Sequence, residues 1–151
     1  MLPGSGSAET RGAEGISALL DGVAAWAAQC PGVGAVALVG SYAGGRARPD
    51  SDVDLVVLAT DPAVLLGDRG WLHRFGAPES VAVESWGAVT SLRVHYTDGL
   101  EVEWGLAAPL WAAVDPLDPG TARVVAAGLR PLYDPDGLLA RLSAAVAVGG
   151  C

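Results

Sequence analysis

Two aspartates, Asp52 and Asp54, stand at the start of an apolar run that ends at Leu58. On an extended chain, residues two positions apart project to the same side, so both carboxylates face the same space. Neighbouring carboxylates repel each other unless a cation lies between them, and their hard oxygen atoms suit Mg²⁺. The pair therefore predicts a divalent-cation site.

A turn of small residues precedes the aspartates. Gly40 and Ser41 follow a short apolar run, residues 35–39, that is typical of a buried strand. Gly40 allows a sharp turn and a close approach of a ligand to the backbone, and Ser41 is expected to cap the next helix. The first amide groups of a helix favour an anion. A phosphate-binding turn beside a magnesium carboxylate pair is the equipment for phosphoryl or nucleotidyl transfer.

The order of these features resembles the signature of the polymerase-β-type nucleotidyltransferase superfamily. Gly40 and Ser41 lie between two apolar strands, Asp52 follows Ser41 by eleven residues, and Ser51 precedes the Asp52/Asp54 pair. Small bacterial members are the most similar in this respect, namely the minimal nucleotidyltransferases and the aminoglycoside and lincosamide adenylyltransferases. The resemblance implies an α/β (α+β) fold in which helices flank a mixed, mainly antiparallel central sheet. The alternative interpretation is an Asp-rich loop in which Asp50 and Ser51 only initiate a turn.

The resemblance also implies roles for individual residues. Asp52 and Asp54 would bind Mg²⁺, with two ions expected, and a third carboxylate would join them from a neighbouring strand. The nucleotide-binding positions of the superfamily correspond to four residues of this chain: Gly40, Ser41, Arg46 and Ser51. Many relatives carry an arginine where this chain has Gly44, so the source of the positive charge that binds phosphate stays open.

The third carboxylate is sought after the hairpin turn that Asp98 and Gly99 predict. Glu101 and Glu103 alternate with apolar residues in this segment and share one face of a strand. Similar runs in small adenylyltransferases place the carboxylate at Glu103, with Glu101 as the second candidate and Glu84 as the third. This carboxylate would complete the metal site or accept the proton of an attacking hydroxyl.

The rest of the chain is expected to form one domain, residues 14–151, after a disordered leader over residues 1–13. Helices are predicted over 15–29, 62–76 with a break near Gly67, 109–114, 121–129 and 138–148. Strands are predicted over 35–39, 53–58, 81–86, 89–96 and 100–106, with a closing strand and turn over 132–137.

The composition limits the partners. The net charge is −8, and all nine basic residues are arginines. This balance argues against a nucleic-acid substrate, because phosphate backbones demand a basic surface. It suits a cationic small molecule, or simply a soluble acidic surface. No apolar run has membrane-spanning length and the N-terminus lacks the pattern of a secretion signal, so a cytoplasmic protein without membrane contact is expected.

Three functions fit these residues. The resemblance implies transfer of AMP from ATP to a hydroxyl of a small molecule or a protein, with Mg²⁺ and with release of pyrophosphate. The first alternative is an antitoxin-type minimal nucleotidyltransferase that acts on a partner toxin. The second is a nucleotide-binding module without catalysis. No helical acceptor-binding domain follows the core, so a homodimer could supply the missing wall of the acceptor site.

Overall fold

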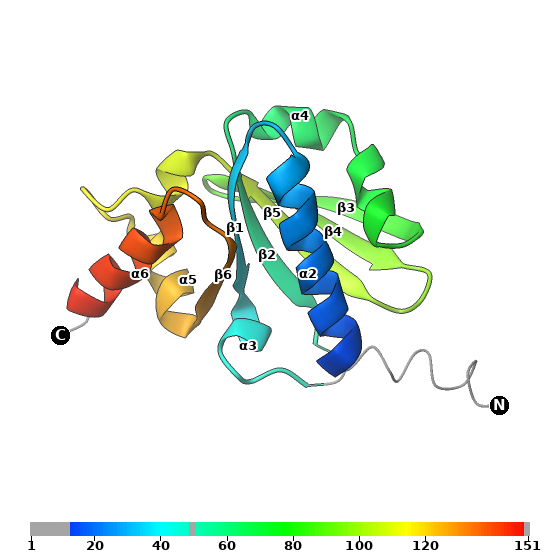
Figure 1. Ribbon diagram of the computed structural model, residues 1–151, viewed down its shortest axis with the longest axis horizontal. Helices are drawn as coiled ribbons and strands as arrows, with labels where there is room; N and C mark the ends of the chain where they lie inside the picture. The colour runs from blue at the N-terminus through cyan, green and yellow to red at the C-terminus, as the bar shows by residue number, and fades with distance from the viewer. Residues whose placement is uncertain (1–12, 49–50, 150–151) are drawn as a thin grey trace.

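A six-stranded sheet forms the centre of the computed structural model, which describes residues 13–48 and 51–149 (Figure 1). The strand order is β3-β4-β5-β2-β1-β6. The β2–β5 pair is parallel, and every other neighbouring pair is antiparallel. The predicted mixed, mainly antiparallel α+β fold is therefore confirmed. The predicted leader lies outside the described residues, apart from its last position.

The elements follow one another along the chain as the figure labels them. The strands are β1 (Val33–Val39), β2 (Val53–Ala59), β3 (Pro78–Trp86), β4 (Val89–Tyr96), β5 (Glu101–Ala107) and β6 (Leu129–Tyr133). The helices are α2 (Ala13–Gln29), α3 (Gly40–Ala43), α4 (Pro62–Gly67), α5 (Pro119–Ala127) and α6 (Leu138–Gly149), with 3-10 helices η1 (Gly70–Phe75) and η2 (Pro109–Ala112). Among the described residues, no helix combines the length and hydropathy needed to cross a membrane.

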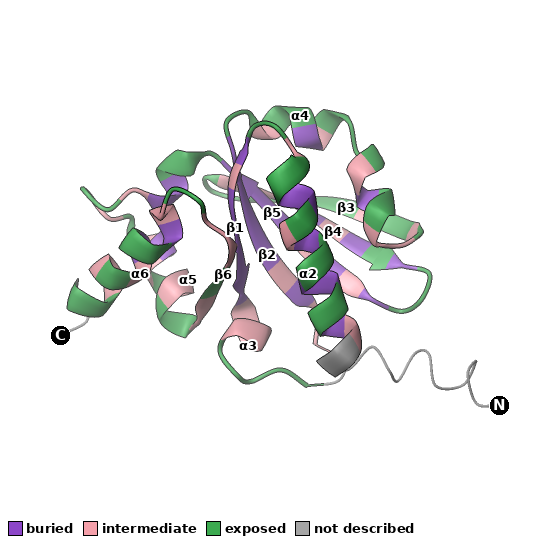
Figure 2. Ribbon diagram, viewed as in Figure 1, coloured by how far each residue is buried: buried purple, intermediate pink, exposed green. Residues whose placement is uncertain are grey.

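Alternation along the strands divides the apolar side chains between two cores. Strands β1 and β2 are buried along most of their length (Figure 2). On β2, Leu55 and Val57 pack with helix α2, whereas Val56 and Leu58 pack on the other face with α6. A strand buried on both faces needs apolar residues at successive positions, which explains the nearly continuous apolar runs of β1 and β2.

An aromatic cluster ties α2 and η1 to β5. Trp26 stacks on Trp71 with 5.0 Å between the ring centroids, and the rings of Trp71 and Phe75 each lie 4.9 Å from that of Trp104. Trp104 is fully buried and follows Glu103 in the chain, so its side chain points to the opposite face of the sheet. The cluster therefore anchors the strand that carries the predicted third carboxylate.

The segment predicted as a broken helix is interrupted at Gly67, as expected. Asp61 caps α4 by accepting a hydrogen bond from the N–H of Ala63 (3.2 Å), and Pro62 occupies the first turn. The second part differs from the prediction, because it is the 3-10 helix η1. The short helix predicted over 109–114 is likewise a 3-10 helix, η2.

Helix α5 begins and ends earlier than predicted. Asp118 caps it by accepting a hydrogen bond from the N–H of Thr121 (3.0 Å), so the helix starts at Pro119. It ends before Gly128, whose φ of 140° is not helical and strongly favours glycine. Strand β6 therefore begins at Leu129, where a helix end was predicted.

Gly128 also packs against the backbone of Gly44. A Cβ at position 128 would lie 2.7 Å from the Gly44 nitrogen. We expect Gly128→Ala to lower the free energy of unfolding by more than about 1 kcal/mol, because both the positive φ and the contact oppose a side chain. Urea denaturation measures this. Gly22→Ala, at an open position of α2, is the control and should raise stability by about 0.5–1 kcal/mol. Equal effects would contradict the close packing of Gly128.

Candidate active site

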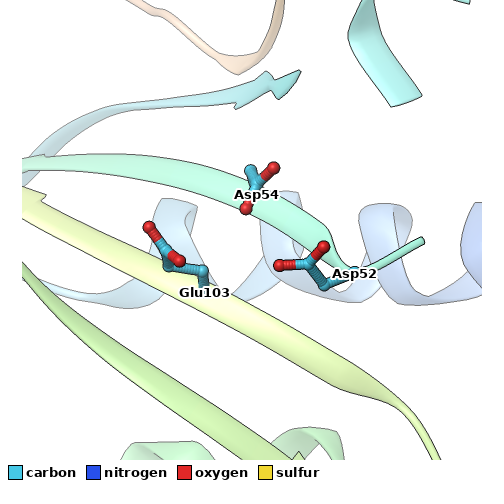
Figure 3. Close-up of side chains that lie close together, drawn as sticks. All are labelled: Asp52, Asp54 and Glu103. Atoms are coloured by element: carbon cyan, nitrogen blue, oxygen red, sulfur yellow. The ribbon is translucent and has the colours of Figure 1, made fainter. Parts of the chain in front are cut away.

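Asp52, Asp54 and Glu103 come together at one end of the parallel β2–β5 pair (Figure 3). One carboxylate oxygen from each residue lies within 4.8 Å of the other two. Asp54 and Glu103 are direct register partners, and Asp52 precedes the first residue of β2. Three oxygen donors at this spacing fit a divalent cation such as Mg²⁺.

The carboxylates lie where the second core gives way to a cleft. Asp54 shares its face of β2 with buried Val56 and Leu58, so the apolar repeat of the strand determines where the acidic side chains point. The cleft has a volume of about 640 Å³. All three carboxylates line it, and the other lining side chains include Trp86, Val89, Trp111, Thr121 and Val124.

Gly40 lies directly against Asp54 at the end of β1. Its φ is 73°, and a Cβ at this position would lie 2.3 Å from Oδ2 of Asp54. A glycine is therefore needed twice, for the turn and for the approach of the carboxylate. Gly40 also lines the cleft, as a ligand-contacting turn would.

Ser41 does not cap a helix, so that prediction is wrong. The four-residue helix α3 starts one position earlier, at Gly40, and its cap residue is Val39, with no side-chain cap. The carbonyl of Ser41 instead accepts a hydrogen bond from the N–H of Arg46 (2.8 Å). The Ser41 side chain is half-buried, and its contact with a nucleotide stays a prediction.

Arg46 and Ser51 both make contacts that hold the loop between α3 and β2. Nη2 of Arg46 donates a hydrogen bond to the carbonyl of Ala127 (3.0 Å), at the end of α5. Oγ of Ser51 accepts a hydrogen bond from the N–H of Arg48 (2.8 Å). These contacts give both residues a structural role. The binding of nucleotide by Arg46 and Ser51 stays a prediction.

Arg93, which the sequence analysis did not single out, lies among the carboxylates. Its guanidinium donates hydrogen bonds to Asp52 (3.2 Å), to Glu101 (2.7 Å) and to Glu103. Its Nε lies 3.5 Å from a carboxylate oxygen of Glu84. A positive charge is therefore present in the site, although it does not come from the turn where many relatives carry an arginine.

The register of the hairpin places this residue among the carboxylates. A turn at Asp98 and Gly99 sets the register of β4 against β5, which places Arg93 opposite Glu103 and His95 opposite Glu101. Opposite charges that face each other across antiparallel strands attract. A two-residue turn at Asp98 and Gly99 would have paired Arg93 with Trp104 instead. In the structure Tyr96 pairs with Leu100 and residues 97–99 form the loop, so the turn signal alone did not predict the Arg93–Glu103 pair.

Geometry separates the three candidate glutamates. Glu103 belongs to the group of three oxygen donors. Glu101, one pleat away, contacts Arg93 and lies 3.7 Å from Nε2 of His95. Glu84 contacts Arg93 from β3. Among the described residues, the group of three includes neither of these two, so the arrangement favours Glu103.

The carboxylates raise one another's proton affinity. Burial raises the pKa of Asp54 to about 7, and the negative charges of Asp52 and Glu103 add to this effect. Burial also raises the pKa of Glu103, and the positive charge of Arg93 opposes that shift. A bound cation favours the ionised form of a neighbouring carboxylate, so this site suits a cation electrostatically.

The raised pKa of Asp54 predicts a pH-dependent cost. The unfolded chain loses this proton near pH 3.8 and the folded protein near pH 7, so stability falls as pH rises through this window. Asp54→Asn removes the cost. In EDTA, the variant should match the natural protein at about pH 3.5 and exceed it in free energy of unfolding at about pH 8, measured by urea denaturation. A difference that does not change with pH would contradict the shift.

The contact between Gly40 and Asp54 predicts a loss of metal affinity. In Gly40→Ala, the new Cβ displaces the carboxylate, and we expect Mn²⁺ to bind at least about tenfold more weakly in calorimetric titration. Gly45→Ala is the matched control, because its φ is 74° but nothing lies within 4 Å of the new Cβ. Equal Mn²⁺ affinities in the two variants would show that the contact does not matter for the site.

Comparison with known proteins agrees with this arrangement. Residues 25–82 match the family model of the nucleotidyltransferase domain. Among solved structures, an aminoglycoside 6-adenyltransferase from Bacillus subtilis is similar, with a TM-score of 0.51 and 18% sequence identity. The match covers 62% of this chain and 35% of that one, so this chain spans about a third of its neighbour's length. No curated protein shows significant sequence similarity.

The family match spans the positions of Gly40, Asp52 and Asp54, and the structural match supports the fold. Residues 25–82 are therefore similar in sequence to a nucleotidyltransferase domain, and the fold is similar to that of an adenyltransferase.

Proposed function

We propose that the protein is an enzyme that transfers a nucleoside monophosphate, most simply AMP from ATP, to a hydroxyl group. The observation that carries this proposal is the convergence of Asp52, Asp54 and Glu103 on one point beside Gly40. The family match supports nucleotidyl transfer in general, and the adenyltransferase among the similar structures supports adenylyl as the group transferred. Mg²⁺, with two ions proposed, would supply charge neutralisation at the phosphates when bound.

The three acidic residues have two proposed roles, cation binding and proton acceptance. Asp52 and Asp54 would hold the cation, because their oxygens are hard donors from one edge of the sheet. Glu103 would join them or accept the proton of the acceptor hydroxyl. In the reaction, the acceptor oxygen bonds to the α-phosphorus, the bond from this phosphorus to the bridging oxygen breaks, and pyrophosphate leaves. The proton of the hydroxyl passes to a carboxylate.

The turn after β1 would hold the nucleotide. The backbone of Gly40 lines the cleft beside the carboxylate of Asp54, so a phosphate bound at this turn would lie next to the proposed cation. We extend this binding surface to Ser41, Arg46 and Ser51, the other residues of the signature. Arg46 would then exchange its bond with the Ala127 carbonyl for one with a phosphate oxygen.

The cleft favours a small acceptor. Its volume of about 640 Å³ is that of a small-molecule site, and Trp86 and Trp111 line it together with the acidic residues. The net charge of −8 disfavours a nucleic-acid acceptor. A small hydroxylated molecule is therefore the proposed acceptor, with a second copy of the chain as a further wall. A partner protein is the alternative acceptor, and the presence of all three carboxylates disfavours an inactive module.

The test follows labelled phosphate. Purified protein is incubated with ATP, Mg²⁺ and cell extract, with the label on the α-phosphate in one sample and on the γ-phosphate in another. We expect the α-label to appear on an acceptor and the γ-label only in pyrophosphate. Asp52→Asn and Asp54→Asn should each lower the transfer by at least about a hundredfold.

Both variants should remain folded, since each removes one charge from a group of like charges. Asp21→Asn, at an exposed position of α2, is the matched control and should transfer normally. Near-normal transfer by either site variant would show that its carboxylate is not needed. Transfer of the γ-label would point to a kinase instead.

A further inference from the structure

Arg93 contacts two kinds of carboxylate. Two of its partners, Asp52 and Glu103, belong to the candidate metal ligands, and the other two, Glu84 and Glu101, do not. Because a divalent cation would use the first pair, Arg93 and the cation compete for the same oxygens. We propose that Arg93 is an internal counter-ion that a divalent cation displaces onto Glu84 and Glu101. This inference rests on the metal site of the proposed function.

The contacts show where the guanidinium can move. Nη1 already donates to Glu101 at 2.7 Å, and its bond to Asp52 is longer, at 3.2 Å. Oε1 of Glu84 is buried, has no hydrogen-bond partner among the described residues and lies 3.5 Å from Nε. A small shift away from Asp52 and Glu103 would therefore retain the bond to Glu101 and complete one with Glu84.

The charges favour this division. One guanidinium faces four carboxylates, and Asp54 is a fifth carboxylate close to two of them. A dication at the three candidate ligands, with Arg93 on the other two carboxylates, would leave each group with one excess negative charge. Arg93 cannot lose its own charge in a protein, so it can leave the ligands only by moving.

Two roles of Arg93 predict opposite effects on metal affinity. If it competes with the cation, its removal tightens binding, because a nearby positive charge and two bonds no longer oppose the metal. If it only braces the carboxylates, its removal loosens the site and weakens binding. The sign of the change therefore decides between a displaced counter-ion and a structural ion pair.

The experiment is a titration with Mn²⁺ in the absence of nucleotide. We expect Arg93→Met to bind Mn²⁺ at least about tenfold more tightly than the natural protein in isothermal calorimetry. Arg93→Lys keeps the charge and should stay near the natural affinity. Arg74→Met, at an exposed position of η1, is the control for loss of an arginine. Unchanged or weaker Mn²⁺ binding by a folded Arg93→Met protein would overturn the proposal.

Stability gives a second, independent measurement. In EDTA, Arg93→Met should melt at a lower temperature than the natural protein, because its carboxylates have no counter-ion. Saturating Mn²⁺ should narrow the difference, because the variant binds the ion more tightly. An unchanged deficit in Mn²⁺ would contradict the proposal. If the variant folds only with metal present, competition with a chelator from the Mn²⁺-loaded state gives the same comparison of affinities. Neither measurement uses ATP, so a failure here is distinct from a failure of nucleotidyl transfer.

Discussion

Repulsion among carboxylates on one side of the sheet is the constraint on which the site depends. Five acidic side chains gather there: Asp52, Asp54, Glu84, Glu101 and Glu103. The opposite faces of the same strands hold them in place, since Leu55 and Trp104 are almost fully buried. Complete burial of one such side chain contributes about 1.5–3 kcal/mol, and two like charges 4 Å apart near a protein surface repel by about 4 kcal/mol. Several buried side chains together outweigh one such repulsion. Packing can therefore keep the charges together in the absence of a cation.

The sequence predicted the parts of the site that local spacing determines. The two-residue spacing of Asp52 and Asp54 predicted that they share one face of a strand. The hairpin turn at Asp98 and Gly99 predicted that a strand with Glu103 follows it. Spacing alone could not show that β5 lies beside β2, because the parallel pair joins segments far apart in the chain. That neighbourhood was implied by the family resemblance, and the register of Asp54 with Glu103 agrees with it.

The features that sequence analysis missed depend on contacts between distant segments. Arg46 bonds to Ala127, 81 positions later in the chain, and Gly44 packs on Gly128. No local signal at either glycine indicates its partner. At the start of α3, the carboxylate of Asp54 likewise occupies the space that a side chain at position 40 would need, so this position requires glycine.

Asp54 differs from the other two candidate ligands in what compensates its charge. Asp52 and Glu103 both accept hydrogen bonds from Arg93, whereas Asp54 lies against Gly40 and Arg93 lowers its pKa less than burial raises it. A cation therefore stabilises the ionised form of Asp54 without displacing an existing bond, while Asp52 and Glu103 must first release the guanidinium. On this argument the ionised form of Asp54 is stabilised by the metal more than that of the other two ligands. The affinity for the metal is then limited by the replacement of Arg93 at Asp52 and Glu103.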